Sequence, residues 1–112
     1  MDQNGDITLG IVGACNRGGA FKAATEVAPG ARIHAICDLN EQRLPEAQEK
    51  LGAENVYTDY AQMLDEAGLD LVIIGTPMPV HAEQSIAALE RNIHVLCEVT
   101  AAVDLDQCRA LV

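Results

Sequence analysis

The sequence predicts an α/β fold, a doubly wound parallel sheet with helices on both faces. Three observations support this prediction. Short aliphatic runs alternate with helical patterns, a glycine turn follows the first run, and the run 69–74 has the continuous aliphatic character of a strand buried on both faces. The chain has 112 residues, 49% of them hydrophobic. This size suits one domain spanning residues 1–112.

The first half of the sheet begins with a strand and a helix. Aliphatic residues predict a strand at 7–12, and a helical pattern follows at about 18–27. Pro29 and Gly30 end that helix because neither residue continues a helix well. The run 32–37 then predicts the second strand.

A second helix leads to a short third strand. The helix is expected at about 41–51, where Asp38 or Asn40 can cap the first turn by accepting hydrogen bonds from backbone N–H groups. Gly52 stops the helix, since glycine readily adopts the left-handed conformation found after helix ends. The segment 55–57 predicts the third strand.

The fourth strand lies between two further helices. The first of these is expected around 61–67, with Gly68 just past its end, and the run 69–74 forms the strand itself. A helix at about 80–90 follows. The side chains expected to face the core from it are Ile86, Ala87 and Leu89.

The remaining residues predict a fifth strand and a last helix. The strand is expected at 94–97, and Asp104 is placed to cap the helix after it. Right-handed crossovers between parallel strands give the expected strand order 3-2-1-4-5. In such a sheet, the ligand crevice lies at the carboxyl ends of strands one and four, where the order reverses. The segments expected around it are 13–18, Asp38, 76–81 and Glu98.

The loop after the first strand has the pattern of a dinucleotide-binding turn. Gly13 and Gly18 match the first and third glycines of G-x-G-x-x-G, which allow the tight turn and the packing of helix on strand. The second glycine is replaced by Cys15, whose side chain is expected where a diphosphate would pass. Asn16 and Arg17 complete the candidate loop, and Arg17 can supply a compensating charge. A turn that only connects strand to helix is the alternative.

Asp38 follows Gly18 by 20 residues, the spacing at which this fold places a carboxylate on the ribose hydroxyls. The same carboxylate would repel a 2′-phosphate, so NAD is favoured and NADP remains possible. Arg43 on the next helix is the residue that can reverse this preference. A simple helix cap is the alternative role for Asp38.

Composition excludes several classes of partner. The net charge of −10 disfavours a general electrostatic grip on nucleic acid or on anionic lipid. The run 71–74 is too short to span a membrane, and the first six residues lack the pattern of a signal peptide, so a cytoplasmic protein is expected. The four cysteines have no spacing typical of a metal site, and no metal is expected. They are Cys15, Cys37, Cys97 and Cys108.

Three segments together resemble the N-terminal half of the Gfo/Idh/MocA (glucose–fructose oxidoreductase/inositol dehydrogenase) family. They are Ile11-Val-Gly-Ala-Cys-Asn-Arg-Gly18, Ala35-Ile-Cys-Asp-Leu-Asn40 and Asp70-Leu-Val-Ile-Ile-Gly-Thr-Pro77 with His81, and the likeness continues to Glu98. The resemblance implies a Rossmann domain that binds NAD or NADP. It also implies a following substrate-binding domain, often involved in oligomerisation, that this chain does not contain.

The same resemblance assigns roles near the cofactor. It places Thr76, Pro77 and His81 beside the dinucleotide and Glu98 at the nicotinamide ribose. His81 is the candidate acid/base group, with packing or capping at the start of its helix as the equally weighted alternative.

Two positions after the strands depart from the family motifs. Met78 stands where Thr-Pro-Asn has its amide, and Val99 stands where Glu-Lys-Pro has the lysine that often takes part in proton transfer. Val99 can neither donate nor accept a proton. The leading interpretation is therefore the dinucleotide-binding domain of an oxidoreductase that acts on a hydroxyl-bearing small molecule, inactive in isolation. A non-catalytic nucleotide sensor is the alternative, and an S-adenosylmethionine-binding domain is disfavoured by Thr76, Pro77 and His81.

Overall fold

The aliphatic runs of the sequence form the strands of one parallel sheet. The computed structural model describes residues 5–112 and orders the strands β3-β2-β1-β4-β5, which confirms the predicted order. Val12 of the central strand lies opposite Cys37 on one side and opposite Ile74 on the other. The strands are β1 (Ile7–Val12), β2 (Ala31–Cys37), β3 (Asn55–Tyr57), β4 (Leu71–Ile74) and β5 (His94–Cys97).

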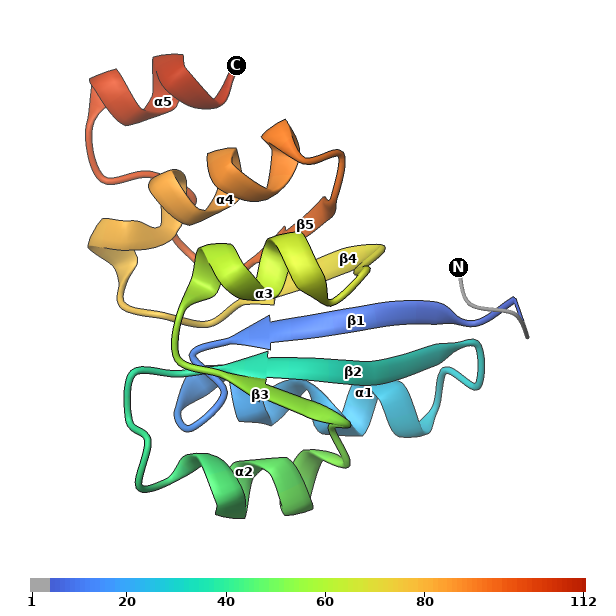
Figure 1. Cartoon of the computed structure of the whole chain (residues 1–112). Coiled ribbons are helices and arrows are strands. Elements are labelled where there is room, and N and C mark those ends of the chain that lie inside the picture. The colour runs from blue at the N-terminus through green and yellow to red at the C-terminus, as the bar shows by residue number, and fades with distance from the viewer. Residues whose placement is uncertain (1–4) are drawn as a thin grey trace.

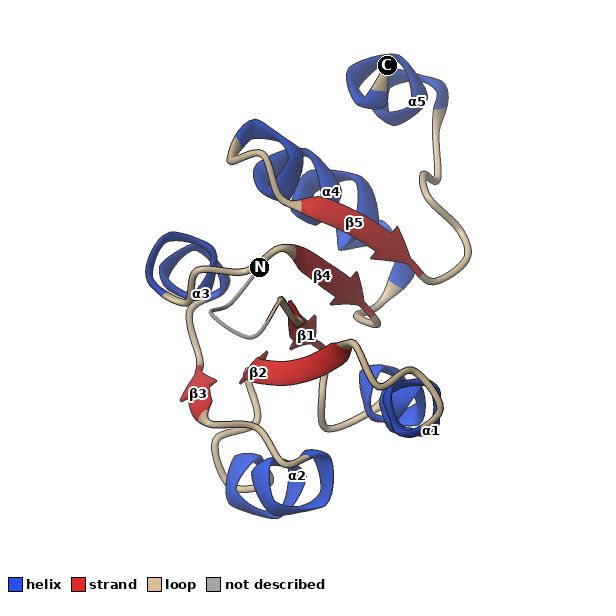
Figure 2. Cartoon of the chain, turned by 90° about the vertical axis from the view of Figure 1, so that its right-hand side faces the viewer, coloured by secondary structure: helices blue, strands red, loops and turns tan. Residues whose placement is uncertain are grey.

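Helices cover both faces of the sheet, with α1 and α2 on one face and α3 and α4 on the other (Figure 1 and Figure 2). Successive residues of β1 therefore enter opposite cores. Ile11 packs with Leu44 of α2, and Val12 packs in the same core as Met63 of α3 and Ala88 of α4. The helices are α1 (Lys22–Glu26), α2 (Leu44–Leu51), α3 (Tyr60–Glu66), α4 (His81–Glu90) and α5 (Leu105–Leu111), with short 3₁₀ turns η1 (Arg17–Phe21) and η2 (Met78–Val80).

Two helices begin later than the sequence predicts. The first helix, expected from residue 18, opens as the 3₁₀ turn η1 and becomes α-helical only at Lys22, consistent with the weak helix propensity of Gly18 and Gly19. The second begins at Leu44 instead of residue 41 because Pro45 has no N–H and fits only in a first turn. Arg43 occupies the N-cap position of α2 without a side-chain cap. Of the two expected caps, Asp38 accepts from backbone N–H groups outside α2, whereas Oδ1 of Asn40 accepts from the Arg43 N–H at 3.3 Å and so caps the turn just before the helix.

Other boundaries and faces are close to expectation. Gly68 follows α3 with φ of 65°, and the Asp104 side chain accepts from the Gln107 amide to cap α5, as predicted. Leu89, expected in the core, is 49% exposed, so that expectation is wrong. The buried face of α4 is instead formed by His81, Ala82, Ser85 and Ala88, which recur at helical spacing.

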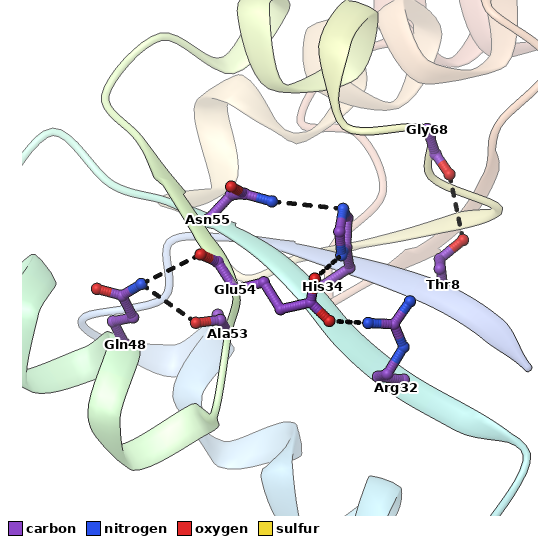
Figure 3. A network of polar contacts seen from close by, with 8 residues as sticks. All are labelled: Thr8, Arg32, His34, Gln48, Ala53, Glu54, Asn55 and Gly68. Atoms are coloured by element: carbon purple, nitrogen blue, oxygen red, sulfur yellow. Dashed lines mark hydrogen bonds and ion pairs between the residues drawn. The ribbon is translucent and has the colours of Figure 1, made fainter. Parts of the chain in front are cut away.

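A polar network fixes the connection between α2 and β3 to the middle of the sheet (Figure 3). The Glu54 carboxylate forms an ion pair with Arg32, and its Oε2 lies 3.2 Å from Nδ1 of His34. Gln48 donates to the carbonyl oxygens of Ala53 and Glu54 at 3.2 and 3.4 Å. No helix within residues 5–112 is long and apolar enough to cross a membrane.

Candidate nucleotide-binding site

A groove of ≈ 620 Å³ opens at the carboxyl ends of the central strands, where the strand order reverses. A ligand is expected at this edge in an open parallel sheet. Segments after β1, β2, β3 and β4 supply its walls, together with the start of α4. The lining residues are Val12, Gly13, Asn16, Arg17, Cys37, Asp38, Leu39, Thr58, Tyr60, Gly75, Thr76, Pro77, Val80 and Gln84.

Three glycines let the loops after β1 and β4 touch through their backbones. A Cβ on Gly13 would lie 2.6 Å from the carbonyl oxygen of Gly75, and Gly13 has φ of 80°. A Cβ on Gly18 would lie 2.6 Å from a methyl carbon of Ile11. A Cβ on Gly75 would lie 2.5 Å from the backbone nitrogen of Gly18. Gly13 and Gly18 thus have the turn and packing roles of the fingerprint, and Gly75 is a third contact that the fingerprint does not include.

The carboxylate of Asp38 faces the glycine loop from the end of β2. Its Oδ2 accepts from the backbone N–H of Cys15 at 3.0 Å, and its Oδ1 accepts from that of Asn40 at 2.9 Å. The carboxylate is therefore fixed at the groove wall instead of capping α2. Each carboxylate oxygen can accept more than one hydrogen bond, so acceptor capacity remains for a ligand hydroxyl.

The side chain of Cys15 is not among the described residues that line the groove. Cys15 is 7% exposed within the core on the α1 and α2 face, and its Sγ lies 4.0 Å from the carbonyl oxygen of Asn40. The sulfur is therefore directed away from the path expected for a diphosphate. What Cys15 offers to the site is its backbone, through the hydrogen bond to Asp38.

The buried thiols at the site are protonated near neutral pH. Burial first, and then the negative charges of Asp38 and Asp59, raise the pKa of Cys37 to about 12. Burial and the charge of Asp38 also raise the pKa of the Cys15 thiol. Neither group is an effective nucleophile in this state.

An ion pair joins the glycine loop to the end of β5. Nε of Arg17 lies 2.7 Å from Oε2 of Glu98, and Oε1 of Glu98 accepts from the Val99 N–H at 3.1 Å. The hydrogen bonds from Arg17 and then from Val99 lower the pKa of Glu98 below its usual 4.5. Because β4 lies between β1 and β5, this pair crosses the edge of the sheet beside the loop after β4.

The loop after β4 is held by side chains that the sequence did not indicate. The Thr76 hydroxyl donates to Oε1 of Gln84 at 2.5 Å, and the Tyr60 hydroxyl donates to the Gln84 carbonyl oxygen at 2.8 Å. Burial is the first cause that raises the pKa of Tyr60, which keeps its phenol protonated. The glycine fingerprint does not point to Tyr60 and Gln84, because both are distant from it in sequence. They reach the same edge of the sheet only through the packing of α3 and α4.

His81 lies beneath the loops after β4 and β5. It is 1% exposed, with Nε2 at 2.6 Å from the Thr76 carbonyl oxygen and Nδ1 at 2.7 Å from that of Thr100. Val99 is 74% exposed and Met78 is 50% exposed, so the two departures from the family motifs lie on the surface. The site residues predicted after β1, β2, β4 and β5 therefore meet at one edge, although the Cys15 and His81 side chains are buried behind it.

The groove fits a dinucleotide in shape and in chemistry. Glycines whose Cβ would collide with backbone lie in its wall, Asp38 offers acceptors on the β2 side, and Arg17, which is paired with Glu98, also lines it. Within residues 5–112 no three His, Cys, Asp or Glu side chains are grouped so that they could hold a metal ion.

Comparisons with known proteins agree with this arrangement. The sequence model of the Gfo/Idh/MocA family, described as an oxidoreductase family with an NAD-binding Rossmann fold, matches residues 7–112. Myo-inositol 2-dehydrogenase of Thermotoga maritima is 30% identical over 87% of this chain and 29% of its own length. Glycosyl hydrolase family 109 protein 1 of Bacteroides fragilis is 34% identical over 95% of this chain and 25% of its own.

A solved structure gives the same result at the level of the fold. Scyllo-inositol dehydrogenase of Lactobacillus casei, crystallised with NAD(H) and scyllo-inositol, superposes with a TM-score of 0.86 at 27% identity, over 95% of this chain and 32% of that one. The chain thus spans about a third or less of the length of these relatives. With the match of the family model and the geometry of the groove, the chain belongs to the Gfo/Idh/MocA oxidoreductase family and forms its NAD-binding Rossmann domain.

Proposed function

We propose that the groove binds NAD(H) with the adenosine ribose at Asp38, the diphosphate at residues 13–18 and the nicotinamide half over the ends of β4 and β5. The observation that supports this most directly is the placement of Asp38 against the glycine loop by its hydrogen bond from Cys15. A fixed carboxylate beside the turn is what ribose recognition in this fold requires. Asn16 and Arg17 contact the diphosphate, and Thr76, Pro77 and Glu98 contact the nicotinamide half.

The complete protein is proposed to oxidise or reduce a hydroxyl-bearing small molecule such as a polyol or sugar. The names of the relatives, inositol dehydrogenases and glycosyl hydrolase family 109 proteins, support this substrate class over a nucleotide sensor. When bound, the nicotinamide supplies the hydride acceptor or donor. The domain described here orients it, and a second domain, which also provides contacts between subunits, positions the substrate.

The proton for such a reaction has to come from a group other than residue 99. Val99 has no ionisable atom, and both ring nitrogens of His81 already face carbonyl oxygens. We therefore assign the acid/base group to the second domain. The free cysteines of the described chain suit a reducing compartment, in line with action in the cytoplasm.

The test is calorimetric titration of the 112-residue chain with NADH and with NADPH. Wild-type protein should bind NADH more tightly than NADPH. Asp38→Ala should weaken NADH by about 1.5–3 kcal/mol, roughly ten- to hundredfold, because it removes hydrogen bonds from a charged acceptor. The NADH affinity of Asp38→Asn, which keeps one acceptor, should lie between those of the wild type and of Asp38→Ala.

The matched control is Asp104→Ala, which removes the cap of α5, lies outside the residues that line the groove and should leave NADH affinity unchanged. Equal losses for NADH and NADPH in Asp38→Ala would show that Asp38 only supports the loop. A folded wild-type chain that binds neither nucleotide would contradict the proposed site.

A further inference from the structure

His81 ties together two loops that come from different strands. Its Nε2 faces the carbonyl oxygen of Thr76, after β4, at 2.6 Å, and its Nδ1 faces the carbonyl oxygen of Thr100, after β5, at 2.7 Å. The residue is 1% exposed, one of the few buried polar side chains among the described residues. A buried polar group is stable only when it is hydrogen-bonded, so the ring lies between the two loops and donates to the carbonyl oxygen of at least one of them.

Two other roles for His81 fit the geometry less well. A capping side chain accepts from the first backbone N–H groups of its helix, whereas α4 has no side-chain cap and the His81 ring points to carbonyl oxygens. A general acid or base must reach a substrate atom, whereas both ring nitrogens here face backbone and are buried.

The two bridged loops carry the contacts proposed for one half of the dinucleotide. Thr76 and Pro77 line the groove on the β4 side, and Glu98 begins the loop that contains Thr100. Asp38, at the end of β2, lies on the other side of β1 from these loops. His81 is therefore connected to the nicotinamide half of the site and separated from the adenosine half.

We propose that His81 is a positioning residue that sets the nicotinamide half of the site by bridging the loops after β4 and β5. The inference rests on the proposed function, because it assumes that the dinucleotide lies across the strand ends. It predicts a selective effect. Loss of the bridge lets the two loops shift relative to each other, while the glycine loop and Asp38 keep their own contacts.

The experiment compares NADH with ADP, which lacks both the nicotinamide and the ribose that carries it, by calorimetry on the 112-residue chain. His81→Ala should weaken NADH binding about tenfold, as expected from the loss of buried hydrogen bonds, and should leave ADP binding within about twofold. His81→Gln and His81→Asn keep an amide donor in the same space, so they should fold and should restore part of the NADH affinity. His94→Ala removes an exposed histidine at the other end of β5 and should change neither affinity.

The outcomes separate this inference from the proposed function. If the wild-type chain binds neither NADH nor ADP, the proposed function fails. If the wild-type chain binds both and the folded His81 variants lose both equally, or lose neither, then His81 does not position the nicotinamide half. Thermal unfolding of each variant shows that the affinities belong to folded protein.

Discussion

Gly75→Ala tests whether the contact between the loops after β1 and β4 holds the site together. An alanine Cβ at this position would lie 2.5 Å from the backbone nitrogen and 2.7 Å from the Cα of Gly18, closer than the 3.0 Å below which such contacts essentially never occur. The obstacle is backbone, which cannot rotate away as a flexible side chain can. The two loops must therefore move apart.

The cost follows from the general behaviour of overpacked sites. Forcing extra volume into a close contact costs about 1–3 kcal/mol. For a chain of this length that loss corresponds to a fall of about 4–13 °C in Tm, from an unfolding entropy of about 2.1 cal/mol/K per residue. NADH binding should weaken by roughly tenfold, the equivalent of one hydrogen bond to the charged diphosphate lost as the loop moves.

Thermal unfolding followed by circular dichroism, with calorimetric titration of NADH, measures both effects. Gly30→Ala is the matched control, because Gly30 is exposed and a Cβ added there would meet only open space among the described residues. Its stability should change by less than about 0.5 kcal/mol. A Gly75→Ala protein with wild-type Tm and wild-type NADH affinity would refute the reasoning.

Four further predictions concern charges and chemistry. Mild alkylation followed by peptide mass mapping should label exposed Cys108 and leave buried Cys37 unlabelled in the folded protein. The folded pKa of Cys37 is about 12, against 9.0 for an ordinary thiol, so its contribution to stability should be complete below pH 9 and be lost as the pH rises toward 12. In alkaline unfolding curves, Cys37→Ala should show a smaller loss of stability over this pH range. Arg17→Ala should raise the pKa of Glu98 in a carboxyl NMR titration, and an unchanged value would rule out the ion pair. The 112-residue chain should show no turnover of polyols or sugars by NADH absorbance, even with Val99→Lys, and robust turnover would overturn the roles given to the second domain and to residue 99.

The pattern of the sequence was sufficient to predict the strands and their order in the sheet. The signals used were local in sequence, and the fold keeps them. They are the continuous aliphatic runs, the glycine turn after the first run and the spacing from Gly18 to Asp38. The start of α2 was missed although the signal was present, since Pro45 restricts the helix to beginning near Leu44. Leu89 was misplaced because α4 buries small residues around His81 instead of its larger aliphatic side chains.

The candidate site was predictable in position and less so in detail. Which way the Cys15 side chain points depends on the α1 and α2 core that receives it, and a loop sequence alone does not contain that information. The role of Gly75 depends on close backbone approach between two strands distant in sequence. Tyr60 and Gln84 likewise reach the groove only through tertiary packing.

Amide chemical-shift mapping by NMR is the measurement that tests whether NAD(H) binds across the carboxyl ends of the strands. On titration with NADH, we expect shifts concentrated at residues 13–18, at Asp38, and in the loops after β4 and β5. The groove between α4 and α5, which includes Ala82, Glu83 and Gln107, should remain unperturbed. Shifts confined to that second groove, or no shifts in a folded chain at saturating NADH, would contradict binding at the strand ends.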